Sequence, residues 1–119
     1  MAFTGNFMCT SFKVQLMTAT HNFTASTGNT FKLAMYDNNA SFTAATTAYT
    51  SSNEVANSGT YSAGGGTLTN VTPTSSGTTA FTDFADLSFT STITAYGALI
   101  YNSSAAGNPS VCVLDFGIS

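Results

Sequence analysis

Few side chains in this sequence could act as an acid, a base or a nucleophile. Only 6% of the residues are charged and the one histidine is His21, whereas ordinary soluble domains carry about 25% charged residues. A hydrolytic triad needs a nucleophile, a base and an orienting acid, and residues 19–23 (ATHNF) carry no nucleophile motif. We therefore expect His21 to be structural, and we expect neither a catalytic residue nor an enzymatic activity.

Asp83 and Asp86 are the only closely spaced carboxylates. Together with backbone oxygens they could form a weak calcium site, because Ca²⁺ takes several oxygen ligands. The alternating Asp/Asn pattern of a calcium-binding loop is absent, so we favour a turn capped by these side chains. One histidine and two distant cysteines also disfavour a zinc site. We expect no metal and no other cofactor.

Cys9 and Cys112 lie near opposite ends of the chain. Residues 1–8 (MAFTGNFM) lack the basic region and the apolar run of a secretory signal, and no stretch approaches the roughly 18 apolar residues of a membrane span. These features predict assembly in a cytoplasm without a membrane partner. In that reducing compartment we favour two free, buried thiols over a Cys9–Cys112 disulfide.

The charge balance also bears on the choice of partner. With two lysines, no arginine and a pI near 4.4, the chain lacks the basic footprint that nucleic-acid binding requires. The glycine run at 64–66 lacks the Gly-Lys-Ser/Thr ending of a phosphate loop. We therefore expect neither a nucleic acid nor a small molecule as the main ligand.

Several segments have the pattern of β-strands that would form the scaffold. Residues 31–36 and 79–84 alternate in polarity, and residues 110–116 are almost continuously apolar. Residues 91–101 are rich in β-branched and aromatic side chains, and Gly97 in their middle indicates a bulge or the close approach of another backbone. We expect residues 93–100 and 111–116 to pair as a central hairpin.

Weaker signals occur elsewhere. Residues 46–51, 68–71 and 87–89 are candidates for short strands. Residues 11–17 (SFKVQLM) fit a strand and a helix capped by Thr10 or Ser11 equally well. Short strands separated by Gly, Ser and Asn turns predict one antiparallel β-sandwich domain over residues 1–119, of jelly-roll or immunoglobulin-like type. One short N-terminal helix remains an open alternative within that class.

The chain also resembles a family, the small virion structural proteins of tailed bacteriophages. The resemblance covers most of residues 11–116 and is carried by the segments THNFT (20–24), FKLAMY (31–36), TAYT (47–50), NEV (53–55), YSAGG (61–65), FTDFAD (81–86), GALIYN (97–102) and VLDFG (113–117). It favours a short helix at 11–17. Tyr96 stands where the family pattern leads us to expect a basic residue.

The resemblance implies a particle protein without a catalytic residue. We expect a decoration or cement protein of the capsid, a homotrimer that binds across subunits of the major capsid protein and resides in the virion. A hydroxyl-rich surface with little charge suits such close packing, because salt does not screen its hydrogen bonds.

Two alternatives remain. One is a tail component such as a fibre, collar or adaptor. The other is a carbohydrate-binding sandwich that would need exposed aromatic side chains, for which the candidates are Tyr36, Tyr49, Tyr61 and Tyr96. We expect these tyrosines to pack inward with only their hydroxyls reaching water.

Overall fold

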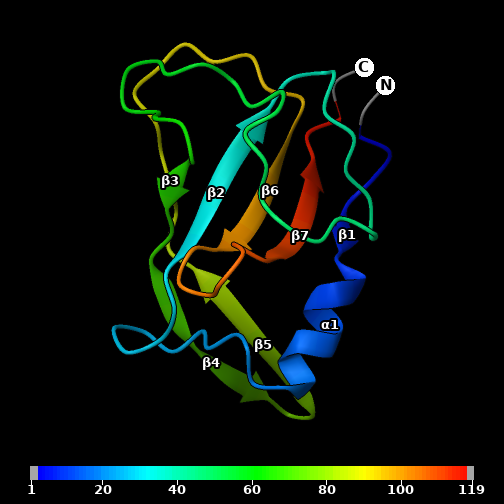
Figure 1. Cartoon of the computed structure of the whole chain (residues 1–119). Coiled ribbons are helices and arrows are strands. Elements are labelled where there is room, and N and C mark those ends of the chain that lie inside the picture. The colour runs from blue at the N-terminus through cyan, green and yellow to red at the C-terminus, as the bar shows by residue number, and fades with distance from the viewer. Residues whose placement is uncertain (1–2, 118–119) are drawn as a thin grey trace.

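The computed structural model describes residues 3–117 and consists of two antiparallel β-sheets and one short helix (Figure 1). The larger sheet has five strands in the order β1-β7-β6-β2-β3, and the smaller is the hairpin β4–β5. This arrangement confirms the mainly β, sandwich-like class. The elements are β1 (Phe7–Met8), α1 (Thr10–Met17), β2 (Phe31–Tyr36), β3 (Gly66–Thr67), β4 (Asn70–Ser76), β5 (Thr79–Phe84), β6 (Gly97–Asn102) and β7 (Ser110–Asp115).

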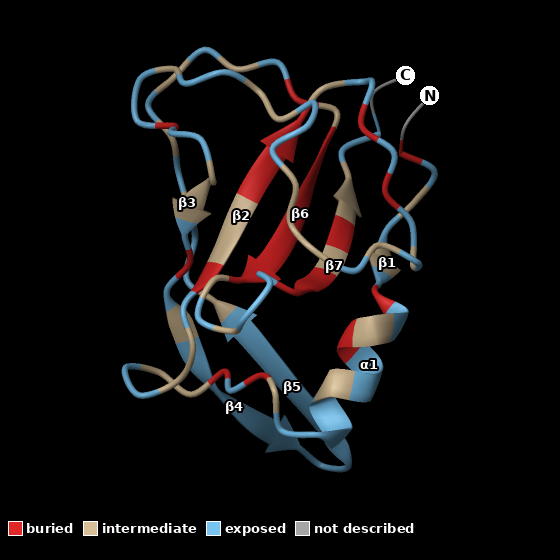
Figure 2. Cartoon of the chain, viewed as in Figure 1, coloured by how far each residue is buried: buried red, intermediate tan, exposed pale blue. Residues whose placement is uncertain are grey.

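The core is built on the three central strands. All six residues of β6 are buried, and β6 pairs antiparallel with β2 on one side and with β7 on the other (Figure 2). The strands expected at 31–36 and 79–84 have those bounds, and the expected pairing of the last two long strands is confirmed. Phe31, Leu99 and Val113 have no exposed surface. Leu99 pairs with Val113 on one face of the sheet, whereas Phe31 pairs with Asn102 on the other, so both faces of the central strands are covered.

The strand expected over residues 91–101 is shorter than predicted. Its first half is a loop that packs along the 58–61 turn, where the Thr60 amide donates to the Thr90 carbonyl. Strand β6 starts at Gly97, where a Cβ atom would overlap the Phe3 ring and the Leu114 carbonyl oxygen. Gly97 thus marks the predicted close approach, and the register shift of this strand lies at Ile100/Tyr101 instead.

Three short strand predictions were wrong in whole or in part. Residues 87–89 form no strand, because Leu87 and Phe89 instead contribute side chains to the core from a loop. Residues 46–51 make only the isolated bridge Ala48–Pro109. Residues 68–71 form no single strand. Leu68 follows β3 and donates its amide to the Phe31 carbonyl of the large sheet, whereas Asn70 and Val71 belong to β4, which pairs with β5.

Residues 10–17 form the helix that the sequence left open. Cys9 is the N-cap and makes no side-chain cap hydrogen bond, so the expected cap by Thr10 or Ser11 was wrong. Phe12 is the buried residue of the helix, whereas Val14, Leu16 and Met17 are exposed. A helix of eight residues is too short to be stable alone, so the packing of Phe12 holds it in place. Within residues 3–117 no helix has the length and apolarity needed to span a bilayer.

The β4–β5 hairpin extends away from the five-stranded sheet. Residues 71–83 are all exposed, although both strands are regularly paired (Figure 2). Pro73 sits at a bulge where two residues of β4 oppose one of β5, a position that tolerates proline. The turn is Gly77-Thr78, with Gly77 at φ +60°, which fits the glycine-first two-residue turn of hairpins.

Candidate functional site

His21 is buried in a polar network at the end of the core. Its Nε2 lies 2.8 Å from Gln15 Oε1 and its Nδ1 lies 3.0 Å from Asn102 Nδ2. The Asn102 Oδ1 atom accepts the amides of Ser104 and Ala105, so its Nδ2 must face the histidine as a donor. This pattern assigns a neutral ring that accepts at Nδ1 and donates from Nε2.

That assignment leaves His21 without a free nitrogen. The ring lies 6.1 Å from Phe31 in a stacked arrangement and 4.9 Å from Phe12. Burial lowers the pKa of His21, because desolvation disfavours the charged imidazolium. A general base must reach a substrate proton with an available lone pair, so these contacts favour the structural role expected from the sequence.

A second, half-buried network surrounds Glu54, which the sequence did not single out. Its Oε1 accepts the Tyr49 hydroxyl at 2.6 Å, and its Oε2 accepts the Tyr61 hydroxyl and the Gly64 amide, each at 2.7 Å. Both carboxylate oxygens are therefore engaged. No spacing rule links residues 49, 54, 61 and 64. The usable signal was that the sole glutamate lies within a tyrosine-rich segment.

The tyrosine cluster around Glu54 is locked in its neutral form. Burial raises the pKa values of Tyr36, Tyr49 and Tyr61, and the Glu54 charge raises them further. Tyr36 and Tyr61 are at most 1% exposed, and Tyr49 is half-buried. Tyr96 is also half-buried. These four side chains therefore form no exposed aromatic platform on which a sugar could stack.

The two carboxylates expected to cap a turn are both exposed. The Asp83 Oδ1 atom accepts the amide of Phe84 inside β5, so the expectation that Asp83 caps a turn between two strands was wrong. Asp37 and Glu54 border another hollow, but Asp37 accepts the Asn39 amide. Across residues 3–117, no group of three or more His, Cys, Asp and Glu side chains is placed to hold a metal ion.

The two cysteines are free, as expected. Cys112 lies directly opposite Met8 in the β1–β7 pairing, so Cys9, one residue further, points to the other face of the sheet. Burial raises the pKa of Cys9, and it raises the pKa of Cys112 to about 11. Both side chains are therefore protonated thiols near neutral pH. Cys112 is only half-buried, so the expectation of full burial was wrong for it.

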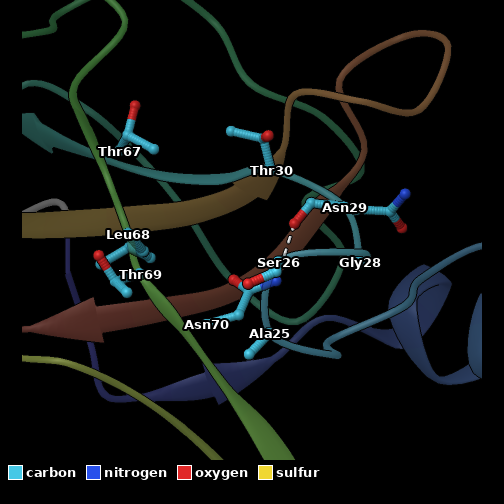
Figure 3. Close-up of a pocket in the computed structure, with 9 residues that line it drawn as sticks. All are labelled: Ala25, Ser26, Gly28, Asn29, Thr30, Thr67, Leu68, Thr69 and Asn70. Carbon is cyan, nitrogen blue, oxygen red and sulfur yellow. Dashed lines mark hydrogen bonds between the residues drawn. The ribbon is translucent and has the colours of Figure 1, made fainter.

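A polar pocket of about 380 Å³ lies beside the junction of β3 and β4 (Figure 3). Asn70 donates from Nδ2 to the carbonyl oxygens of Thr24 and Asn29, and its buried Oδ1 has no hydrogen-bond partner. The lining has no titratable side chain, so it offers hydrogen bonds and no acid–base chemistry. The lining residues are Ala25, Ser26, Gly28, Asn29, Thr30, Thr67, Leu68, Thr69 and Asn70.

An apolar groove lies between α1 and the β4–β5 hairpin. Its volume is about 540 Å³, and Phe81, which is 48% exposed, borders it on the hairpin side. We call the surface formed by this groove and by residues 71–83 the hairpin surface. The groove residues are Met8, Phe12, Leu16, Phe23, Pro73, Ala80, Phe81 and Thr82.

The hairpin surface is the candidate functional site. The aromatic contacts of Phe84 with Phe23 and Phe31 hold the base of the hairpin, while its outer part contacts solvent on both faces. The alternation of residues 79–84 predicted β5 but not this exposure, because alternation alone does not say which strands the core covers. No family model, curated protein or solved structure matches this chain.

Proposed function

We propose that this protein is a non-enzymatic structural component of a bacteriophage virion, and that it decorates and stabilises the capsid. Its partners would be the major capsid protein and further copies of itself, in a trimeric assembly formed in the host cytoplasm. The phage assignment rests on the sequence resemblance described above. The binding role rests on the structure of the hairpin.

The observation that carries the binding role is the exposure of the β4–β5 hairpin. A two-stranded hairpin is marginally stable in water without further packing, yet residues 71–83 contact solvent on both faces. Only the base of the hairpin is tied to the body, through Phe84, the Asn70 amide and the Thr72 hydroxyl, which accepts the Ala25 amide. An element built this way gains its packing from another protein, which is the geometry of an attachment arm.

The composition of the exposed surface supports the same role. Thr, Ser and Asn dominate residues 70–79, and Asp83 is the only charged residue of the hairpin. Contacts made by hydroxyl and amide groups are not screened by salt. Repetition over a symmetric shell multiplies weak contacts through multivalency, so single interfaces need not be large.

The test compares purified particles that contain or lack this protein during a temperature ramp. A cement protein raises the temperature at which the genome is released, because it adds contacts that must break before the shell opens. Equal release temperatures contradict the proposal. Copy number separates head from tail: on the order of hundreds of copies indicates the capsid, and about six or twelve indicates the tail.

A further inference from the structure

The outer edges of the hairpin are open. Strand β4 pairs only with β5, and β5 only with β4, so each strand has one edge without a partner strand in the described chain. Open edges present unpaired N–H and C=O groups that act as templates for another strand. Figure 1 shows the hairpin at the end of the molecule opposite the chain termini, away from the five-stranded sheet.

These edges lack the usual protection against pairing. Natural proteins block edge strands with charged side chains, proline or a covering loop. Asp83 is the only charged residue of β4 and β5, and Pro73 lies at the bulge near the base. Residues 74–76 of β4 and 79–82 of β5 carry neither a charge nor a proline. The half of the hairpin near the turn is therefore free to accept a strand.

We propose that hairpins of different copies of this chain pair edge to edge, with β5 of one copy against β4 of the next. This inference rests on the assembly role proposed above and names the partner at the hairpin surface. The two strands are of nearly equal length, seven and six residues. A β5-to-β4 contact pairs both edges of every copy, whereas a two-fold β5–β5 contact would leave one edge of each copy open. Repeated head-to-tail contacts close into a ring where the rotation between copies closes, and otherwise give an open filament.

Charge permits this contact between identical chains. The formal net charge is −3, but the four other acidic residues (Asp37, Glu54, Asp86 and Asp115) and both lysines lie outside the hairpin. Asp83 sits at the base of β5, opposite Val71. Edge pairing near the turn therefore places no like charges opposite each other, which would destabilise a sheet.

The apolar area is also sufficient for a stable contact. Met8, Leu16 and Phe81 are about half exposed, at 53%, 46% and 48%, and Met17 at the end of α1 is 81% exposed. Aromatic side chains present about 150–250 Å² each, and at the lower end of that range these four side chains leave roughly 340 Å² open. A standard interface buries about 800 Å² per partner, of which a little over half is apolar. The three groove residues together with Met17, which lies outside the groove lining, supply most of that apolar share, and the polar strands can supply the rest.

The experiment compares Phe81→Ser with Phe116→Ser in the full chain. Both replace an exposed phenylalanine of similar exposure, 48% and 45%, but Phe116 follows β7 and lies outside the hairpin. Light scattering after size-exclusion chromatography measures the mass of each variant over a concentration series. We expect the natural protein and Phe116→Ser to be oligomers, and we expect the dissociation constant of Phe81→Ser to be at least tenfold higher.

Hydrogen exchange gives a readout specific to edge pairing. Amides of residues 74–82 should exchange more slowly as protein concentration rises, while those of β6 should not change, because β6 is buried within each copy. A protein that is monomeric at every concentration overturns the inference, as does an oligomer that both phenylalanine variants weaken equally. Concentration-independent exchange of residues 74–82 also overturns it.

The particle assay separates this inference from the proposed function. A monomer that nevertheless raises the genome-release temperature rejects hairpin pairing and supports the capsid role. An oligomer dependent on Phe81 that leaves the release temperature unchanged supports hairpin pairing and rejects the capsid role.

Discussion

At the scale of single residues, the ionisable side chains of His21 and Glu54 stabilise the fold through hydrogen bonds. His21 uses both ring nitrogens, and Glu54 uses both carboxylate oxygens. Buried polar groups of this kind are costly when a partner is removed. Substituting His21 or Glu54 should therefore lower the free energy of unfolding, by an amount set by the hydrogen bonds that are lost.

Replacing Glu54 with alanine should lower the free energy of unfolding by about 3 kcal/mol, because hydrogen bonds to charged groups contribute about 1.5–3 kcal/mol and their buried donors would be left unpaired. The donors are the hydroxyls of Tyr49 and Tyr61 and the amide of Gly64. Urea denaturation measures the change. Asp86→Ala is the matched control, since it removes an exposed carboxylate and should change stability by less than about 0.5 kcal/mol. Equal effects of the two substitutions would show that the Glu54 network contributes nothing.

At the scale of elements, the large sheet and the hairpin differ in how they are stabilised. Strands β2, β6 and β7 form the buried centre of the large sheet, whereas the outer part of the hairpin is held by the pairing of β4 with β5 and by the turn between them. Regions with few buried contacts open more easily than the core. The stability of the hairpin should therefore respond to its turn residue more than the stability of the sheet does.

Gly77 at the hairpin turn provides the test of this difference. Its φ is +60°, and a Cβ atom there would meet nothing within 4 Å, so a substitution acts only through the backbone. Gly77→Val should destabilise the hairpin by about 1–2 kcal/mol, because L-residues with a Cβ avoid left-handed conformations. Hydrogen exchange should become faster in β4 and β5 and stay unchanged in β6.

Asparagine is the matched replacement at this turn, because its side chain tolerates the left-handed region better than valine does. Gly77→Asn should retain most of the hairpin protection. If valine and asparagine have the same effect, the turn conformation does not control the hairpin.

At the scale of the whole molecule, the two networks predict how stability depends on pH. On the acid side, the pKa of His21 is lowered from an unfolded value of 6.5 by burial. The unfolded chain therefore binds a proton below about pH 6.5 that the folded chain refuses, and stability falls as pH falls through this range. His21→Gln removes the titrating ring, so its melting temperature should change less between pH 7 and pH 5. Parallel curves for the two proteins would contradict this origin.

On the alkaline side, the raised pKa values of Tyr36 and Tyr61 make the protein less stable as pH rises. Unfolded tyrosines ionise near pH 10, whereas these two remain protonated in the fold. Above pH 10 the folded chain therefore holds more protons, and the free energy of unfolding falls by up to about 1.4 kcal/mol per pH unit for each group. Tyrosinate absorbance should appear together with the loss of circular dichroism. Ionisation of all tyrosines well before unfolding would contradict their burial.

Local sequence patterns predicted several of the β-strands. Alternating polarity predicted β5 with its bounds, and a continuous apolar run predicted β7, because side-chain period and strand geometry are properties of neighbouring residues. The composition alone shows how few side chains are charged. This scarcity led to the expectation that His21 and Asp83 have structural roles.

The tertiary structure decided which local possibilities were realised. Residues 11–17 fitted two periods equally, and the packing of Phe12 against Phe23 and His21 selected a helix over residues 10–17. Glu54 and its tyrosines meet only because loops fold over the sheet, and the exposure of the hairpin follows from which strands the core covers. Such outcomes depend on contacts between residues distant in sequence, whose energies no local pattern contains. The sequence therefore determined the strand-forming segments and the small number of ionisable side chains, while the tertiary structure decided which strands stay exposed to solvent.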